Sequence, residues 1–477
     1  MAESREKKLI KNSFLFVISE ISTKLILFLL TPFYTAVLSN EQFGISDLLT
    51  TTVTLTTPFF TIVITEAVMR FALDKESDNN DVFSIGLYTT IIGSLILGVL
   101  SYFVFPFITI LKDYWFFFIV YFFAYNFYGL LSNFTKGLNR VKPLALVGIA
   151  NTLILVLLNI LFLIKLKMGI KGYLLASIIA TGLSSVVLFF AIKAYLYIKW
   201  IPAINKRVWN DMFRYSFPMI PNSAMWWINN SSDRYIVTYL VSSAANGIYS
   251  VAYRIPSIFS VIMSVFMQAW QISVVDDFGT KEGTSFFNRI YSLFIRANIV
   301  LCASIVITSK IIGRLIFLGT FFDAWKYSVA LIIGYSFHSL AGFLGTIYTS
   351  VKKTRQLFTS TAIAAIINIV LNIVLIKTWL GKGPFFATMG AAVATIISYF
   401  ISYIIRRVKA KKYIKLNVNT GLYVFEFIIV CLMALLMILD NKISIITSVI
   451  LYILIIVLNF NVIIEMTKTI RRKVLNK

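Results

Sequence analysis

The chain has 477 residues, of which 59% are hydrophobic, 16% aromatic and 13% charged, and its mean hydropathy is +0.85. Soluble domains usually carry about 25% charged residues, so this composition excludes an ordinary soluble protein, a disordered chain and a disulfide scaffold. The net charge of +24 does not indicate nucleic-acid binding, because lysine and arginine lie between apolar stretches, as membrane topology requires. We expect an all-α integral membrane protein.

Fourteen apolar runs are long enough to cross a bilayer, which takes about 20 residues. They are predicted at 12–37, 44–71, 83–108, 114–135, 143–164, 170–192, 215–240, 247–275, 288–309, 326–350, 356–376, 387–405, 421–439 and 443–465. The first run is too long for a signal peptide and lacks a cleavage site, so we expect it to stay as an anchor. The short loops leave no room for an inserted soluble domain.

Positive charges set the predicted orientation. With the N-terminus inside, cytoplasmic segments hold 29 of the 44 lysines and arginines, external loops hold 10 and span interiors hold 5. This bias predicts that both termini are cytoplasmic and that the number of spans is even. The external loop 165–171, with its three lysines, is a local exception.

An internal repeat divides the chain. LNRVKPLALVGIANTLILVLLNILFLIK (138–165) aligns with VKKTRQLFTSTAIAAIINIVLNIVLIK (351–377) at a shift of 213, and this lays Asn159 on Asn372. Repeats of six spans have the same orientation, with a site between them. We predict two parallel six-helix lobes, at 1–200 (spans 1–6) and 201–412 (spans 7–12), and two additional spans at 413–477.

Polar residues concentrate in predicted spans 1, 2, 7 and 8, at helical spacings that place them on one face of each helix. They are Ser13, Glu20, Lys24, Thr31 and Thr35; Asp47, Thr51, Thr54, Pro58, Thr61 and Thr65; Asn222, Asn229, Asn230, Asp233 and Arg234; and Arg254, Ser257, Ser260, Ser264, Gln268 and Gln271. Spans 1 and 2 correspond to spans 7 and 8 under the repeat. We therefore predict that the four helices line one hydrated cavity.

Five basic residues lie inside predicted spans: Lys24, Arg70, Arg234, Arg254 and Arg296. Each costs about 2.5–3.5 kcal/mol at a helix centre, so a functional role is the first hypothesis. A cavity with excess positive charge suits an anionic substrate, and arginine suits phosphate through paired hydrogen bonds.

The acids near these cations leave an alternative open. Glu20 and Glu66 each stand one turn before a cation, at Lys24 and Arg70, and could form ion pairs within their helices. Arg70 and Arg234 lie near span ends and could extend to the interface. With Asp47 and Asp233, these acids are candidates for ion coupling or for pairing.

Few residues can support other chemistry. The two cysteines, Cys302 and Cys431, lie far apart in apolar runs, and His338 is the only histidine. These residues offer no zinc site, no disulfide framework and no serine–histidine–aspartate triad. We interpret His338 as a hydrogen-bonded packing residue rather than a proton relay. Trp226 and Trp227 fit either sugar stacking or an interfacial aromatic belt. We expect no catalytic residue, metal or cofactor.

Several segments resemble one family in order over most of the first 410 residues. They are TPFYTAVLSNEQFG (31–44), ITEAVMRFALDKE (64–76), GLNRVKPLALVGIAN (137–151), GIKGYLLASIIA (169–180) and YSFPMIPNSAMWWINNSSDRYIVTYLVSSAANGIYSVAYRIP (215–256). The chain resembles the Wzx-type flippases for O-antigen and capsule repeat units, a polysaccharide transport family of the MOP superfamily. That superfamily also includes MATE exporters and lipid II flippases.

The resemblance implies a flippase that moves undecaprenyl-diphosphate-linked oligosaccharide from the cytoplasmic to the outer leaflet by alternating access. It implies a MOP/MATE-like two-lobed bundle whose cationic cavity uses Lys24, Arg70, Arg234 and Arg254. It also implies the bacterial inner membrane, lipids around the chain, and a polysaccharide polymerase and glycosyltransferases of the same pathway as partners. Coupling to Na⁺ or H⁺ is known in the superfamily, but no ion-site motif carries over.

Three other functions compete. A MATE-type drug antiporter would favour an acidic cavity for drug cations, whereas five bases stand here beside about three acids. A membrane glycan polymerase or ligase, an enzyme, would need a large external loop, which the sequence lacks. A scaffold would not explain polar stripes on four helices.

Overall fold

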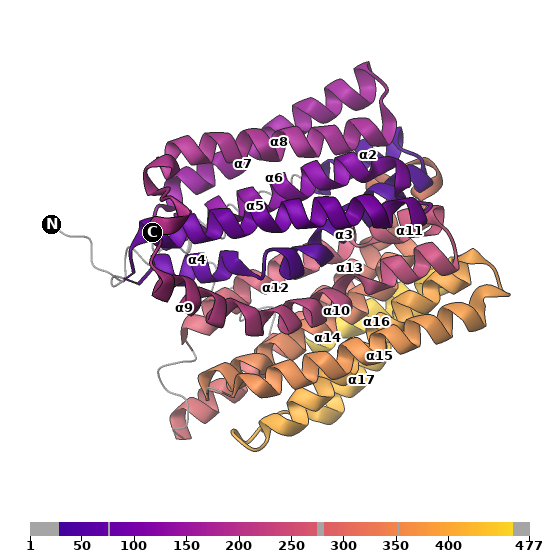
Figure 1. Cartoon of the computed structure of the whole chain (residues 1–477). Helices are drawn as coiled ribbons and strands as arrows, with labels where there is room; N and C mark the ends of the chain where they lie inside the picture. Colours follow the sequence, from indigo (N-terminus) through magenta and orange to yellow (C-terminus); the bar gives the residue numbers. More distant parts are fainter. Residues whose placement is uncertain (1–27, 75–76, 274–280, 352, 461–477) are drawn as a thin grey trace. The chain divides into compact units, whose positions relative to one another are not determined.

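The computed structural model describes residues 28–74, 77–273, 281–351 and 353–460, and in these residues it contains helices and no strand (Figure 1). The predicted sites Glu20 and Lys24 lie outside the described residues. The chain divides into two compact units, Met1–Ser231 (unit 1) and Ser232–Lys477 (unit 2). The predicted lobe boundaries, at 200 and 412, stay a prediction.

Unit 1 contains α2 (Thr31–Val37), α3 (Asn40–Phe60), α4 (Ile64–Ala72), α5 (Asn79–Val104), α6 (Trp115–Gly137), α7 (Val141–Asn159), α8 (Gly169–Ala191), α9 (Lys206–Ser216) and the first half of α10 (Ile220–Leu240). Unit 2 contains the rest of α10 and α11 (Ser243–Ala252), α12 (Arg254–Ser273), α13 (Lys281–Ile316), α14 (Ala324–Ser350), α15 (Thr354–Leu380), α16 (Pro384–Ala410), α17 (Thr420–Leu439) and α18 (Lys442–Leu458).

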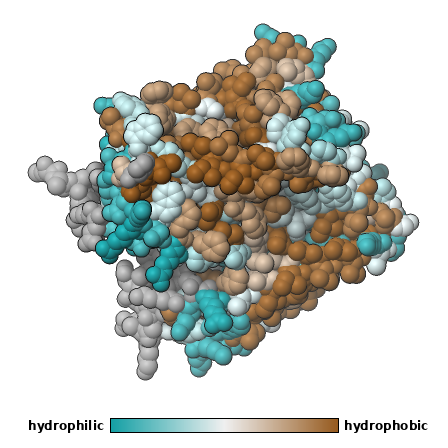
Figure 2. Space-filling view, viewed as in Figure 1, coloured by the Kyte–Doolittle hydropathy of each residue, from teal (hydrophilic) through white to brown (hydrophobic). Residues whose placement is uncertain are grey.

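The helices have the length and the surface of membrane spans. Within the described residues, ten helices are long and apolar enough to cross a bilayer, or eleven if the bent pair α3 and α4 is one span. Large apolar side chains are exposed along them, including Phe107 at 87% and Leu315 at 69%, and Figure 2 shows hydrophobic residues over much of the visible face. Such a surface fits lipid rather than water. The predicted all-α membrane class is confirmed, and the count of fourteen spans stays a prediction.

The second predicted span, 44–71, is not one helix. Helix α3 begins with a capping box, in which Ser39 and Gln42 bond to each other's backbone N–H at 3.2 Å. It ends after Pro58, which has no N–H to donate to the preceding turn. Ile62 and Val63 then take φ of 54° and 53°, unusual for β-branched residues, and α4 leaves at an angle of 63°.

A close contact accompanies this bend. The carbonyl oxygen of Phe60, at the end of α3, approaches Gly93 on α5 so closely that a Cβ on Gly93 would lie 2.0 Å from it. Only glycine allows a backbone approach of this kind. The position of the bend therefore depends on a residue 33 positions away.

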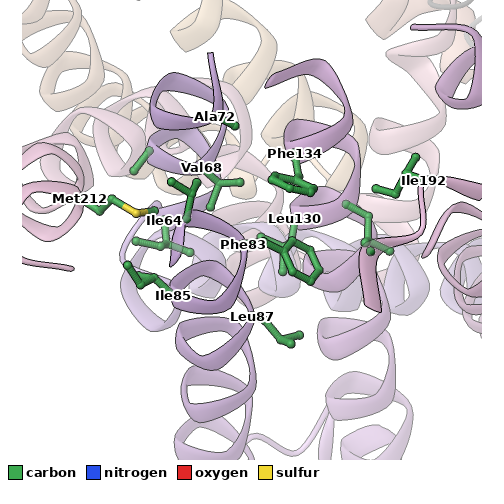
Figure 3. Packing of buried hydrophobic residues seen from close by; sticks show 14 of the residues in the cluster. Ile64, Val68, Ala72, Phe83, Ile85, Leu87, Leu130, Phe134, Ile192 and Met212 are labelled. Atoms are coloured by element: carbon green, nitrogen blue, oxygen red, sulfur yellow. The ribbon is translucent and has the colours of Figure 1, made fainter. Parts of the chain in front are cut away.

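The core of unit 1 joins α4, α5, α6 and α9 (Figure 3). Val68, Phe83, Leu130 and Phe134 are fully buried, and Met212 of α9 belongs to the same cluster. The sequence predicted only a basic cytoplasmic segment where α9 lies. Its apolar side packs on the core, and its first turn is capped by Asn205, which accepts a hydrogen bond from the backbone N–H of Arg207 at 2.9 Å.

Lys199, in the segment before α9, forms ion pairs and hydrogen bonds with the beginning of α5. Lys199 Nζ donates to Asp78 at 2.6 Å and to Asp81 at 2.9 Å. The Lys199 backbone N–H donates to Ser84 Oγ at 2.7 Å, and Tyr88 Oη donates to the Lys199 carbonyl at 2.9 Å. The hydrogen bonds to Asp78 and Asp81 raise the pKa of Lys199, and the bond from Lys199 lowers the pKa of Asp78.

Replacing Lys199 by methionine is expected to lower the free energy of unfolding of the detergent-purified protein by about 1–3 kcal/mol, because Asp81 is only 3% exposed and loses its cation. The exposed Lys206 offers a matched control, since Lys206→Met removes a charge nearby without breaking an ion pair. Denaturant unfolding of both variants measures the difference, and equal stability would contradict the anchoring role of Lys199.

The same contact predicts a pH dependence. The pKa of Asp78 is lowered by folding, so its stabilising effect is present above its unfolded value of about 3.9 and is lost as the pH falls through the lower folded value. The pKa of Lys199 is raised, so its contribution is complete below about pH 10.4 and is lost as the pH rises through the folded value. The stability gap between the wild type and Lys199→Met should stay constant between these limits.

Unit 2 is organised around α14, in which 78% of the most apolar window is buried. Near one end of this helix, Phe343 stacks against Trp270 at 4.9 Å and Phe294 at 4.8 Å between ring centroids. Arg406 of α16 donates from its guanidinium to Ser360 Oγ at 3.0 Å and to the Ala341 carbonyl at 2.8 Å. An arginine at the predicted cytoplasmic end of α16 thus joins three helices.

Candidate functional site

The candidate residues of unit 1 lie on the two halves of the bent span. Asp47 is half-buried on α3, while Glu66 and Arg70 stand one turn apart on α4, with Arg70 exposed. These two described residues form no ion pair with each other, although their spacing allows one. The alternative of self-neutralisation is therefore not what the structure shows at Arg70.

Most threonines of α3 bond to their own helix. Thr54, Thr57 and Thr61 donate their hydroxyls to carbonyls three or four residues earlier, at 2.8–2.9 Å. Trp227 of α10 adds a contact within unit 1, since its indole Nε1 donates to the Thr51 carbonyl and to Thr54 Oγ1 at 3.2 Å. Trp227 is 8% exposed and Trp226 is 61% exposed, so Trp227 is a packing residue.

Asp233 is the centre of a polar cluster in unit 2. It is 2% exposed, and its carboxylate accepts hydrogen bonds from Tyr249 Oη at 2.8 Å, from Tyr253 Oη, and from the backbone N–H of Arg234 at 2.9 Å. The Arg234 guanidinium lies 4.9 Å from the centroid of the Tyr253 ring. The cation and the acid of this pair are thus both held by tyrosines, neither of which was predicted from the sequence.

Aromatic side chains extend this cluster. The ring of Tyr335 lies 6.2 Å from Tyr253 and 6.3 Å from His338, and His338 lies 4.7 Å from Tyr399. His338 is exposed in the structure and makes no hydrogen bond in the part of the chain described. The interpretation of His338 as a hydrogen-bonded packing residue is therefore wrong, because its ring contacts tyrosine rings instead.

A buried amide network lies beside Asp233. Asn368 Oδ1 accepts from Ser232 Oγ at 3.3 Å and from Asn372 Nδ2 at 3.0 Å, while Asn368 Nδ2 donates to Ser398 Oγ at 3.3 Å. These bonds join α10, α15 and α16. In unit 1, Asn159, the repeat partner of Asn372, donates to Tyr34 Oη at 3.1 Å and is also fully buried.

The remaining cations differ in how they are held. Arg254 is the first residue of α12 and is half-buried, and its guanidinium forms no hydrogen bond or ion pair in the described structure. Arg296 on α13 lies 6.0 Å from the ring centroid of Tyr423 on α17. On the same helix as Tyr423, Glu426 is within electrostatic range of Arg296, and this acid was not predicted from the sequence. Arg254 is thus a half-buried cation without a protein partner among the described residues.

No group of three or more histidine, cysteine or acidic side chains within the described ranges could hold a metal ion. Of the acids described above, Asp233 has the most hydrogen-bond donors, namely Tyr249, Tyr253 and the Arg234 backbone. Arginines lie in membrane helices of each unit, and two of them in unit 2, Arg234 and Arg296, lie against tyrosine rings.

Residues 9–271 match the family model described as polysaccharide biosynthesis protein. The chain belongs to this family. The predicted resemblance to a polysaccharide family is confirmed by this match. No curated protein matches the sequence.

Solved structures give the fold of this family member. The lipid II flippase MurJ in an inward closed conformation matches with a TM-score of 0.69 and 16% identity, over 94% of this chain and 100% of that one. A mutant of the Vibrio cholerae MATE transporter VcmN matches with a TM-score of 0.57 and 13% identity, over 86% of this chain and 98% of that one. A multidrug resistance MATE family transporter of the MOP superfamily matches with a TM-score of 0.58 and 11% identity, over 83% of this chain and 98% of that one. At these identities the similarity shows the fold, and the predicted MOP/MATE-like architecture is confirmed.

Proposed function

We propose that this chain is a flippase that moves undecaprenyl-diphosphate-linked oligosaccharide from the cytoplasmic to the outer leaflet by alternating access. The family, named for polysaccharide biosynthesis, and the similarity to a lipid II flippase support a lipid-linked glycan as the cargo. The observation that carries the proposal is the guanidinium of Arg254, which lies in a membrane helix and has no protein partner among the described residues. An unpaired cation there is costly unless a ligand provides the counter-charge.

The diphosphate suits the proposed site. Guanidinium groups bind phosphate oxygens through two parallel hydrogen bonds, and the strength of these bonds grows where water is excluded. Arg254 and Arg70 are the two described candidates without a protein partner. Arg234 and Arg296 lie against tyrosine rings, so they can bind the substrate only if they give up these contacts for contacts with the diphosphate. Lys24 is proposed from the sequence alone.

Coupling to Na⁺ or H⁺ would use an acid within the membrane. Glu20, Asp47, Glu66 and Asp233 are the proposed candidates, and Asp233 has the most developed surroundings, with three hydrogen-bond donors. We further propose the bacterial inner membrane as the location, with both termini cytoplasmic. The proposed partners are a polysaccharide polymerase and glycosyltransferases.

The test is a flipping assay on the purified chain in vesicles. A fluorescent undecaprenyl-diphosphate oligosaccharide is placed in both leaflets, and a membrane-impermeant reductant bleaches the outer one. The proposal expects complete bleaching with the protein and about half without it. Half bleaching with folded protein, and no polyprenyl diphosphate among the co-purified lipids by mass spectrometry, would refute the proposal.

A MATE-type cation antiporter is the second candidate. It is favoured by the fold similarity to MATE transporters and by the presence of the acid Asp233 within a membrane helix. Vesicles that carry an ethidium-like cation separate the two functions. Cation efflux driven by an ion gradient, without lipid flipping, would support the antiporter.

A further inference from the structure

A further buried acid, Glu426, lies among the C-terminal helices of unit 2, and Arg296 is the residue assigned to transport above that acts on it. Glu426 is on α17 and Asn459 ends α18, and both are fully buried in unit 2. Arg296 faces the same region from α13. Each of these three side chains has a buried hydrogen-bonding atom without a partner in the described structure.

The amide of Asn459 has no hydrogen left to donate. Its Nδ2 donates to Glu426 Oε1 at 3.0 Å and to the Ile455 carbonyl at 3.0 Å. Two buried oxygens are left without a donor in the described structure, Glu426 Oε2 and Asn459 Oδ1. A buried oxygen that stays unpaired destabilises the folded state. One proton on Oε2 removes both costs, because the carboxylic acid then donates to Oδ1 while Oε1 accepts from Nδ2.

The alternative partner of Glu426 is Arg296. The Nε of Arg296 is buried and has no acceptor, and Arg296 forms no ion pair with Glu426 in the described structure. Its guanidinium lies over the ring of Tyr423, whose hydroxyl is hydrogen-bonded to Ser292 of α13. If Glu426 lost its proton, Arg296 would be the nearby cation that neutralises the carboxylate. Glu426 Oε2 could then no longer donate a hydrogen bond to Asn459 Oδ1.

The other neighbours of Glu426 do not change this balance. Helix α14 packs on α17 through the stacked rings of Phe337 and Phe427, which do not titrate. Helix α18 contributes Tyr452, which is hydrogen-bonded to Ser304 of α13. Within the described ranges, the charged group that acts on Glu426 is therefore Arg296 from α13, while Tyr423 lies one turn before Glu426 on α17.

We propose that Glu426 is a proton-binding site with two states, a neutral acid paired with Asn459 and a carboxylate paired with Arg296. In the forward step the O–H bond at Oε2 breaks, the proton passes to water and the electron pair stays on the carboxylate. Glu426 lies about 9 Å along the helix axis from the first residue of α17. The use of this proton in the transport cycle rests on the proposed function, but the protonation does not.

Infrared difference spectroscopy of the purified full chain tests the site without transport. As the pH is raised, the C=O band of a buried carboxylic acid should disappear, and Glu426→Gln should remove this band from the difference spectrum. Asp233→Asn, which changes another buried acid, should retain it. Arg296→Gln should keep the band to higher pH, because the ionised form loses its partner. A Glu426 band that persists at every pH, or no such band at any pH, would overturn the proposal.

The pH dependence of flipping tests whether the proton on Glu426 takes part in transport or only stabilises the pair with Asn459. Glu426→Gln keeps both hydrogen bonds to Asn459, since its amide donates to Oδ1 and its oxygen accepts from Nδ2. We expect this variant to keep its unfolding midpoint and to lose the pH dependence of flipping, with roughly a 10-fold lower rate at the wild-type optimum, the effect of about 1.4 kcal/mol. A wild-type pH profile in this variant would refute the role of the proton in transport. Failure of wild-type flipping would refute only the proposed function, since the infrared result stands alone.

Discussion

Replacing Arg254 by alanine is expected to reduce flipping by roughly 30- to 150-fold. This reduction corresponds to the loss of one charge-assisted pair of hydrogen bonds, worth about 2–3 kcal/mol. Folding should be unaffected, because the guanidinium forms no hydrogen bond or ion pair within the described structure. The vesicle assay measures the rate, and surface polysaccharide at matched expression measures export in cells.

Arg254→Lys separates charge from geometry at this position. Lysine keeps the charge but lacks the planar fork that binds two phosphate oxygens, so we expect an intermediate rate. Lys382→Ala is a suitable control, since Lys382 is an exposed residue in the turn between α15 and α16. Unchanged flipping in Arg254→Ala would remove Arg254 from the substrate site.

Replacing Gly93 by alanine is expected to destabilise the fold by about 1–3 kcal/mol, the usual cost of forcing atoms into a packed site. The new Cβ would lie 2.0 Å from the Phe60 carbonyl oxygen, and a backbone atom cannot move aside as a flexible side chain can. The end of α3 would have to shift, with the left-handed residues Ile62 and Val63 directly after it. Denaturant unfolding of the purified protein gives the free energy.

The same helix provides the control for this prediction. At Gly98 of α5, the nearest atom to an added Cβ is Ile119 Cγ2 at 3.9 Å, an ordinary contact. Alanine is a better helix former than glycine by about 0.8–1.0 kcal/mol, so Gly98→Ala should be neutral or stabilising. Gly93→Ala should therefore lower the free energy of unfolding, whereas Gly98→Ala in the same helix should leave it unchanged or raise it. Equal effects of the two substitutions would show that the contact with Phe60 does not hold the bend.

The membrane class and most helices were readable from the sequence because apolar length is a direct consequence of bilayer thickness. The bend in the second span was not, although Pro58 marked a weak point there. Its position depends on the approach of Phe60 to Gly93, a tertiary contact. Helix α9 was missed because its apolar side is short and its sequence between 206 and 216 is rich in charge.

The candidate site was predictable to the extent that charges in a membrane are rare. Each intramembrane arginine stands out by its cost, but its partner comes from the fold. Tyr253, which lies over Arg234, stands at the end of the next helix along the chain, whereas Tyr423 meets Arg296 from a distant segment. Glu426 was overlooked because α17 lies outside the repeat and reads as a plain apolar run.

The acid in α17 also bears on how the chain enters the membrane during synthesis. A charged residue at a helix centre opposes insertion by about 2.5–3.5 kcal/mol, whereas each Leu, Ile, Val or Phe favours it by about 0.3–0.6 kcal/mol. More than half of the 20 residues of α17 are of these four types, and its hydropathy of 2.8 is the highest among the ten candidate spans described. The apolar residues of α17 can therefore offset the cost of its acid during insertion, and Glu426 acquires its partner Asn459 only when α18 has also entered the membrane.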